Sequence, residues 1–290
     1  MTDTRSSVQA PVAPVLVSRR GLAHEARAAK VVWQRDLIRF RTDRGRMISS
    51  LVQPILFLFV LGKGLGSALD TGDGVDYSTF LFPGTLATGV MFTAVFSAIS
   101  IVWDREFGFL REMLVAPVSR SAIVIGKCLG GATVATLQGI VLLALAGLVG
   151  VPYEPLLLLG MLALLFLTAF AITAFGLVIS VRVQQIQTVM PRVQLLLMPL
   201  MFLSGSLFPV SGSLPAWLRF LTHVNPMSYA VDAMRRLTFH YLPAGDVPGG
   251  LRSTLTWGDW TVPVWVDVLV VAGTGGVLLA IACGMLSRSE

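Results

Sequence analysis

Long apolar runs alternate with short polar segments along the chain after residue 46. Most of these runs reach the ~20 residues that an α-helix needs to cross a hydrocarbon core of ~30 Å. They are continuous, unlike the alternating ~10-residue segments of an outer-membrane β-barrel. The pattern therefore predicts an all-α integral membrane protein with six transmembrane helices. The predicted spans are residues 47–69, 77–103, 121–151, 156–181, 189–209 and 262–286.

Pro54 lies inside the first predicted span. A proline there has no N–H to donate, so the carbonyl one turn earlier loses its helical partner. In a membrane such a group must find another donor, because lipid offers none. We therefore expect a neighbouring helix to satisfy it.

The segment 24–44 has a helical period of a different kind, with a narrow apolar stripe and basic residues away from it. This pattern is typical of an amphipathic helix at the inner membrane surface, here with Trp33 and Phe40 in the headgroup layer. Val31 and Ile38 project from the opposite side, so covering them requires a second apolar contact, such as a soluble partner. A plain juxtamembrane helix is the alternative. The stripe is Ala26, Ala29, Trp33, Leu37 and Phe40, and the residues away from it are Arg27, Lys30, Arg35, Asp36 and Arg39.

A charged island, residues 104–120, separates the second and third spans. Within it, Phe107, Leu110 and Leu114 share one face of a short helix that Pro117 ends. The island thus presents apolar and charged surface together, as a helix docked into a cleft or lying along a membrane does. A solvated connecting helix is the alternative. The charged residues off the apolar stripe are Glu106, Arg111 and Glu112.

The region between residues 209 and 261 is too polar to span the membrane, yet it carries aromatic residues suited to the boundary between lipid and water. It predicts a re-entrant helical hairpin on the outer side, with an ordinary outer loop as the alternative. Its boundary aromatics are Trp217, Tyr229, Trp257 and Trp260.

Composition agrees with a membrane protein: 54% of the 290 residues are hydrophobic and only 13% are charged. Soluble domains carry about 25% charged residues. The formal net charge of +6 does not indicate a nucleic-acid partner, because ten of the 22 Lys and Arg residues precede the first span. The predicted topology places 17 of them inside and five outside. This bias predicts that both termini are cytoplasmic.

The first 23 residues have no apolar core of the kind a signal peptide needs, so we expect a flexible cytoplasmic tail there. The predicted domains are thus this tail (1–23), the interfacial helix (24–44) and a six-span membrane domain (45–290). Membrane lipid is the first expected partner.

Charged residues near the ends of the spans are expected to be solvated or to extend towards the interface. Lys127, Arg192 and Asp267 are of this kind. The two cysteines, Cys128 and Cys283, lie in apolar runs and are expected to serve as packing residues.

The motifs of familiar catalytic and nucleotide-binding sites are missing. The sequence has no G-x-x-x-x-G-K-[ST] phosphate loop, no zinc-protease histidine pair and no G-x-S-x-G elbow. We therefore expect neither a cofactor, a metal nor enzymatic activity in this chain. A separate subunit that supplies energy would explain how a protein with six spans and no ion relay can function. Alternatives are an ion-coupled secondary transporter, an intramembrane enzyme and a structural membrane partner.

Two motifs together resemble the permease subunits of ABC-2 type exporters, the group that includes daunorubicin-resistance and nodulation-factor export systems. One is D-R-E-F-G-F-L-R-E-M-L-V-A-P-V-S-R-S with the G-K that follows it. The other is the outer L-F-P, L-P-A-W-L and N-P-M-S-Y series. The resemblance extends from about Trp33 onward and implies a bacterial inner-membrane protein that exports an amphipathic drug, lipid or glycolipid.

The resemblance also implies partners and roles. Two cytoplasmic ATPase subunits would bind ATP and Mg²⁺, and a second copy or a sister permease would complete the membrane dimer. The coupling contacts to the ATPase would come from Glu106, Phe107, Leu110, Arg111, Glu112 and Leu114 and from Trp33, Arg35 and Phe40. The outer re-entrant gate would be Leu207, Pro209, Pro215, Trp217, Asn225, Pro226 and Tyr229. Candidates for the translocation path are Phe59, Phe92, Phe96, Met198 and Phe202.

Overall fold

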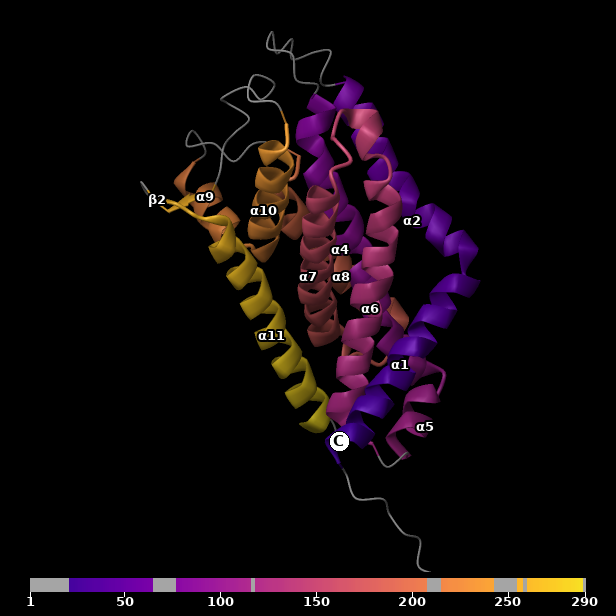
Figure 1. Cartoon of the computed structure of the whole chain (residues 1–290). Coiled ribbons are helices and arrows are strands. Elements are labelled where there is room, and N and C mark those ends of the chain that lie inside the picture. The colour runs from indigo at the N-terminus through magenta and orange to yellow at the C-terminus, as the bar shows by residue number, and fades with distance from the viewer. Residues whose placement is uncertain are drawn as a thin grey trace, which may run out of the picture.

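The computed structural model describes residues 21–64, 77–115, 118–207, 215–242, 255–257 and 260–288. Helices make up nearly all of this part of the chain, in agreement with the predicted all-α class (Figure 1). The elements in chain order are α1 (Leu22–Thr42), α2 (Arg44–Leu56), a π-helical turn (Phe57–Leu61), α4 (Tyr77–Glu106), α5 (Phe109–Val115), α6 (Arg120–Leu143), a 3₁₀ turn (Ala146–Val149), α7 (Pro155–Ser180), α8 (Ile186–Phe202), α9 (Ala216–Val224), α10 (Pro226–His240), β1 (Thr256–Trp257), β2 (Trp260–Thr261) and α11 (Val264–Arg288). The strands form one antiparallel pair that joins Thr256 to Thr261 and Trp257 to Trp260.

Within the described residues, five helices are long and apolar enough to cross a membrane. They correspond to the first four predicted spans and the last: Met47–Gly64, Tyr77–Glu106, Arg120–Leu143, Pro155–Ser180 and Val264–Arg288. The fifth predicted span, residues 189–209, is replaced by the shorter helix α8. Its 17 residues rise only about 25 Å at 1.5 Å each. The chain leaves the helix after Phe202 and turns through Gly205, whose φ is +69°.

The predicted third span is also too long. Helix α6 ends at Leu143, and the 3₁₀ turn that follows closes on Gly150 with a φ of +77°. Glycine adopts this left-handed conformation without steric cost. The turn reverses the chain into α7.

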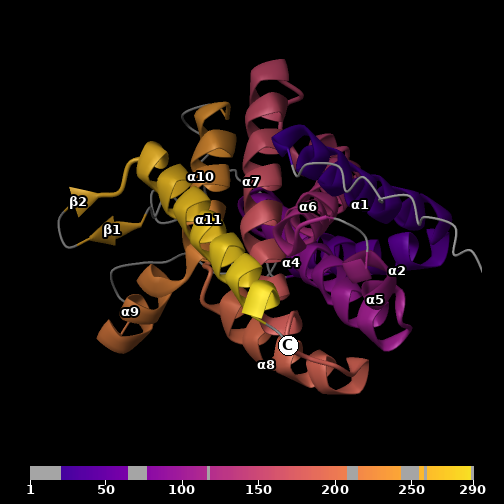
Figure 2. The same ribbon diagram turned by 90° about the horizontal axis from the view of Figure 1, so that it is seen from below.

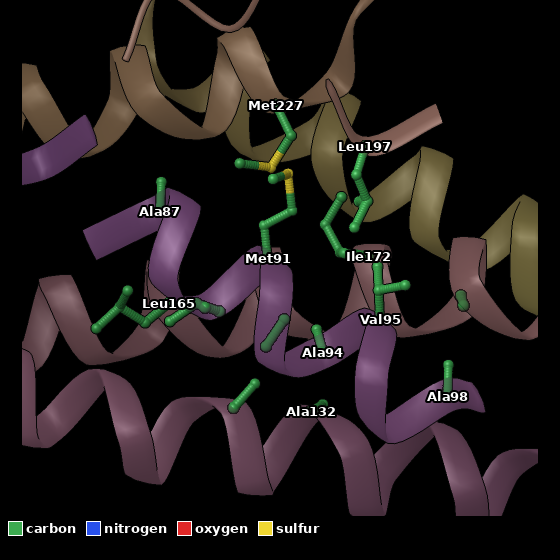
Figure 3. Packing of buried hydrophobic residues seen from close by; sticks show 14 of the residues in the cluster. Ala87, Met91, Ala94, Val95, Ala98, Ala132, Leu165, Ile172, Leu197 and Met227 are labelled. Atoms are coloured by element: carbon green, nitrogen blue, oxygen red, sulfur yellow. The ribbon is translucent and has the colours of Figure 1, made fainter. Parts of the chain in front are cut away.

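Helix α4 forms the centre of the bundle and is buried along nearly its whole length. It packs between α6 and α7, and its inward face carries many small residues (Figure 3). A Cβ atom on Gly176 of α7 would lie 2.7 Å from the Cβ of Ala98, so α4 and α7 cross where neither bears a bulky side chain. Small residues let membrane helices approach closely. The core residues labelled in Figure 3 are Ala87, Met91, Ala94, Val95, Ala98, Ala132, Leu165, Ile172, Leu197 and Met227.

The expected partner for the carbonyl freed by Pro54 is present. Gln138 of α6 donates its Nε2–H to the carbonyl oxygen of Ser50, at 3.1 Å, which is the acceptor that Pro54 cannot serve. The Oε1 atom of Gln138 in turn accepts from the Thr93 hydroxyl of α4 at 2.5 Å. The prediction for Pro54 is thus confirmed, and Gln138 joins α2, α4 and α6.

Replacing Gln138 with Leu, which has similar volume, should lower stability. The substitution leaves the Ser50 carbonyl and the Thr93 hydroxyl without this partner, a loss of about 1–3 kcal/mol. Thermal unfolding in mild detergent measures the effect. Gln34→Leu, at an exposed position of α1, is the matched control. Equal melting temperatures for the two variants would show that Gln138 does not hold α2.

Helix α1 lies across α6 on a face that includes Ala29 and Trp33 of the predicted stripe and extends to Val32 and Asp36. Its buried residues are Val32 and Asp36, and Trp33 Nε1 donates to the hydroxyl of Thr133 at 3.0 Å. The reason is a glycine groove on α6: a Cβ on Gly126 would meet the Ala29 carbonyl oxygen at 2.6 Å, and one on Gly130 would meet Asp36 Oδ2 at 2.9 Å. The assignment of Asp36 to the polar side of this helix was therefore wrong.

The expectation for the opposite side of α1 is confirmed. Val31 and Ile38 are 64% and 67% exposed, so the described part of the subunit leaves them uncovered.

Candidate functional site

Three charged side chains from three different helices meet near the end of the bundle that carries α5. The Nζ atom of Lys127 (α6) lies 3.0 Å from Asp36 Oδ1 (α1) and 2.7 Å from Asp104 Oδ2 (α4). It also donates to Ser100 Oγ at 2.9 Å. Lys127 is fully buried, so the expectation that it extends to the interface was wrong. Helix α1 covers the surface through which it would have reached water.

Arg35 connects this group to α5. Its Nη2 atom lies 2.5 Å from Asp104 Oδ2, and its Nη1 atom donates to Met113 Sδ of α5 at 3.5 Å. We call Arg35, Asp36, Asp104 and Lys127 the ion network. Burial raises the pKa of Asp36, and the positive charge of Lys127 opposes that rise. Charges buried together stay ionised only if they remain paired, so the network ties α1, α4, α6 and α5 to one another.

The predicted coupling segment begins with a turn rather than a continuous helix. Helix α4 ends at Glu106, Gly108 adopts a φ of +83°, and α5 starts at Phe109. Phe107 is therefore not on the helical face of Leu110, as the sequence had predicted: it is 62% exposed, whereas Leu110 is 3% exposed. Glu112 is exposed, and the side chains of Arg111 and Leu114 lie outside the described part of the structure.

Two residues that the sequence pattern did not indicate, Phe109 and Val115, add to the exposed apolar surface that Phe107 provides in this segment. Phe109 is 54% exposed and Val115 is 87% exposed, in addition to Phe107 at 62%. A helix boundary placed after Gly108 would have removed Phe107 from the predicted helical face. Glycine is a signal for such a boundary.

Two further hydrogen bonds join the end of α4 to the connection between α7 and α8. The Glu106 carboxylate accepts from the backbone N–H of Ile186 at 3.0 Å, at the start of α8. Arg105 donates to the carbonyl of Val183 at 2.9 Å. These bonds fix the turn before α5 to the connection between α7 and α8.

Both ends of the described chain also lie at the α5 end of the bundle (Figure 1). Arg120 donates to the carbonyl of Leu286, near the end of α11, at 3.2 Å. Glu25 of α1 accepts from the backbone and hydroxyl of Ser119, the N-cap of α6. Seen along the bundle, α1, α2 and α5 gather beside α6, whereas α9 and the strands lie on the other side (Figure 2).

A cavity of about 370 Å³ lies where α1 and α2 meet at an angle against α4 and α6. Phe92 and Phe96, predicted for the translocation path, line it together with Phe40, predicted for the ATPase contact. The other path candidates lie elsewhere. Met198 lines a separate depression on α8, Phe59 packs against the core, and Phe202 is largely exposed. The remaining lining residues are Asp36, Arg39, Asp43, Ser49, Ser50, Gln53, Pro54, Thr93, Ser97, Ser100, Val134 and Gln138.

The opposite end of the bundle holds two short helices, α9 and α10, which meet at Asn225. The Asn225 Oδ1 atom caps α10 by accepting from the Met227 backbone, and its Nδ2–H donates to the Leu200 carbonyl at 2.8 Å. Pro226 occupies the first turn of α10, where the missing N–H costs nothing. The Tyr229 hydroxyl donates to the His223 carbonyl at 2.7 Å. These bonds fix the angle between the two helices and fasten them to the end of α8.

Of the remaining predicted gate residues, Pro215 precedes α9 and Trp217 is exposed on it. The carbonyl of Leu207 accepts from the Tyr77 hydroxyl at 2.8 Å. Pro209 lies outside the described residues.

A second group of buried charges lies on α10 and α11. Arg236 Nη2 is 2.7 Å from Asp232 Oδ2, and Arg235 lies 4.1 Å above the Phe80 ring. Asp267 is fully buried near them, so its predicted solvation was wrong, whereas Arg192 is exposed as predicted. No group of three or more His, Cys, Asp or Glu side chains in the described ranges is placed to hold a metal ion.

Comparisons with known proteins agree with the resemblance. Residues 27–239 match the family described as "ABC-2 type transporter". "Nodulation protein J" of Rhizobium leguminosarum bv. viciae is 30% identical over 207 residues, which cover 70% of this chain and 79% of that protein. "Putative transport permease ycf38" of Cyanophora paradoxa is 27% identical over 214 residues, covering 72% and 73%. "Probable multidrug ABC transporter permease YbhR" of Escherichia coli strain K12 is 29% identical over 214 residues, covering 71% and 52%.

Proposed function

Because the chain belongs to the ABC-2 type transporter family, we propose that it exports an amphipathic drug, lipid or glycolipid and is driven by a separate pair of cytoplasmic ATPase subunits. Family membership makes it a multi-pass membrane protein and the permease subunit of an ABC exporter. ATP and Mg²⁺ would bind to the partner. The name of one relative, a probable multidrug ABC transporter permease, supports a drug as the exported molecule.

The observation that carries the proposal is the contact of Arg35 with both α5 and the ion network. In the proposed mechanism α5 docks into the ATPase through its exposed residues Phe109 and Glu112, together with Phe107 in the turn before it. Movement of α5 on ATP binding pulls on Arg35 through Met113 and thereby on Asp104. Since packed helices switch between discrete arrangements, this movement would favour one opening of the membrane dimer over the other.

This mechanism revises the role of the N-terminal helix. Trp33 bonds to Thr133 and Arg35 belongs to the ion network, so both side chains are engaged by groups of the same subunit. We propose that they transmit the motion of α5 and that they do not contact the ATPase directly.

The proposed assembly has two permease copies, with the substrate passing between them. Helices α9 and α10 form the outer re-entrant gate, and the α5 end faces the cytoplasm together with both termini. The distribution of Lys and Arg in the sequence supports this orientation, as does the position of the start of α1 and the end of α11 near α5 (Figure 1).

Purification from the native host in mild detergent tests the proposal. We expect a soluble subunit with an ATP-binding phosphate loop to co-purify in stoichiometric amounts. Vesicles that hold both proteins should export substrate only with hydrolysable ATP and should be insensitive to a proton uncoupler. A chain that purifies alone even after cross-linking at α5, with transport that an uncoupler abolishes, would instead support an ion-coupled transporter.

A further inference from the structure

We propose that the cavity between α1, α2, α4 and α6 is a loading site, within a single subunit, for an amphiphile whose head is neutral and forms hydrogen bonds. The inference rests on the proposed export function and adds to it the class of substrate and the place where it enters. Three properties of the cavity lining support the inference: polar side chains without hydrogen-bond partners in the described part of the chain, charged side chains that are already paired, and aromatic rings.

Two neutral polar side chains that line the cavity have unused hydrogen-bonding capacity. The Ser97 hydroxyl of α4 and the Gln53 amide of α2 make no hydrogen bond to any residue that the structure describes. The other neutral side chains of the lining are engaged. Thr93 donates to Gln138, Gln138 donates to the Ser50 carbonyl, and Ser100 accepts from Lys127. The hydroxyls of Ser49 and Ser50 donate to carbonyls of their own helical segment. A hydroxyl or amide on a ligand would therefore find partners at Ser97 and Gln53.

The charged side chains of the lining already have partners within the protein. Asp36 is paired with Lys127, and Arg39 lies 4.0 Å from Asp104 and 5.8 Å from the centre of the Trp103 ring. Asp43 also has an interaction partner. A charged head that entered would lose its hydration without gaining an unpaired counter-charge, which is costly in an apolar cavity. The lining therefore favours a neutral head.

The apolar body of such a ligand would lie against aromatic rings. Phe40, Phe92 and Phe96 line the cavity from α1 and α4, and most of the remaining surface is carbon. A volume of about 370 Å³ lies in the range of ~300–1,000 Å³ that small-molecule sites occupy. One drug-sized molecule, or a lipid head with the start of its chain, would fill it.

The entrance to the cavity lies at the depth of the inner leaflet, where amphiphiles reside. Phe40 and Arg39 belong to the helix that the sequence places at the inner membrane surface, and α2 covers the cavity from the lipid side. Helix α2 is largely exposed on its outer face and contains Pro54 followed by a π-helical turn. Proline and π-turns are where helices bend. An amphiphile could therefore enter from the inner leaflet by bending α2 aside.

Cysteine protection tests the site without requiring ATP. The full chain, with Cys128→Ala and Cys283→Ala, carries Ser49→Cys, at a position that lines the cavity and whose hydroxyl bonds within its own helix, and is placed in lipid nanodiscs with N-ethylmaleimide. Short-chain glucosylceramide is the neutral probe, and ceramide 1-phosphate and sphingosine are its anionic and cationic counterparts. We expect the neutral probe to slow alkylation of the Ser49→Cys variant about tenfold more than either charged probe, because each charged head lacks a counter-charge there. Val52→Cys, exposed beside the cavity but not lining it, should show no protection.

Two substitutions test the recognition groups. Ser97→Ala should weaken protection by the neutral probe about fivefold, through loss of one hydrogen bond. Phe96→Ala should weaken it about tenfold, through loss of an aromatic contact. Phe166→Ala is the matched control, because Phe166 and Phe96 are both 39% exposed and Phe166 lies outside the cavity.

The outcomes separate this inference from the export function. Protection that is equal for all three probes, strongest for a charged probe, or unchanged in Ser97→Ala and Phe96→Ala overturns the loading site. If the ATPase still co-purifies and ATP-driven export persists in those cases, the export function stands without this site. Neutral-selective protection without any ATPase partner would support the site as a binding cavity and refute the exporter.

Discussion

Replacing Lys127 with Met should destabilise the protein by about 3–5 kcal/mol, because it leaves Asp36 and Asp104 buried with one shared cation removed. Lys127 is fully buried and lies within 3.0 Å of both carboxylates. Arg35 reaches Asp104 at 2.5 Å, but it is 3.9 Å from Asp36. The larger penalty should therefore fall on Asp36. Thermal unfolding in detergent and the yield of folded protein in membranes measure the effect.

A double substitution separates loss of pairing from loss of packing. Asp36→Asn together with Lys127→Met removes both charges of one pair and leaves Asp104 with Arg35, so it should recover a large part of the stability lost in the single variant. Lys30→Met, at an exposed position of α1, is the control and should change stability by less than about 0.5 kcal/mol. A single variant as stable as this control would show that the ion network does not hold α1 on the bundle.

Replacing Phe109 with Glu should abolish coupling, with at least a thirtyfold loss of ATPase affinity and loss of ATP-dependent export. In the proposed assembly Phe109 enters the docking cleft, and a central aromatic residue of an interface commonly contributes 2 kcal/mol or more. Phe109 is 54% exposed in the single subunit, so the substitution should leave folding intact. Co-purification with the ATPase and export from vesicles measure the two effects.

Leu148→Glu is the matched control. Leu148 is 65% exposed in the 3₁₀ turn that follows the last residue of α6, whereas α5 precedes the first, so the substitution should leave ATPase binding unchanged. Glu112→Lys, an exposed charge reversal on α5, should weaken docking in the same direction. Leu110→Asp tests something else: Leu110 is buried, so a carboxylate there would disrupt the packing of α5 within the subunit. Wild-type retention of the ATPase by the Phe109→Glu variant would remove α5 from the docking surface.

The sequence alone determined the membrane class, the long spans and the family. These depend on local properties: the length of an apolar run, the absence of charge within it and short motifs. The need for a donor near Pro54 was also predictable, because the missing N–H belongs to the proline itself. The identity of that donor, Gln138, was not predictable, since it lies 88 residues away from Ser50.

The tertiary structure decided which charged residues are buried together. Lys127 and Asp36 are 91 residues apart, and each looked like a residue facing water or the interface. They meet because Gly126 and Gly130 open a groove on α6 into which α1 fits. Hydropathy scores each position by itself, whereas the burial of a charge depends on whether another helix brings its partner. For that reason the five long spans followed from the sequence, whereas the short helix α8, the ion network, the face of α1 and the cavity beside it required the packed structure.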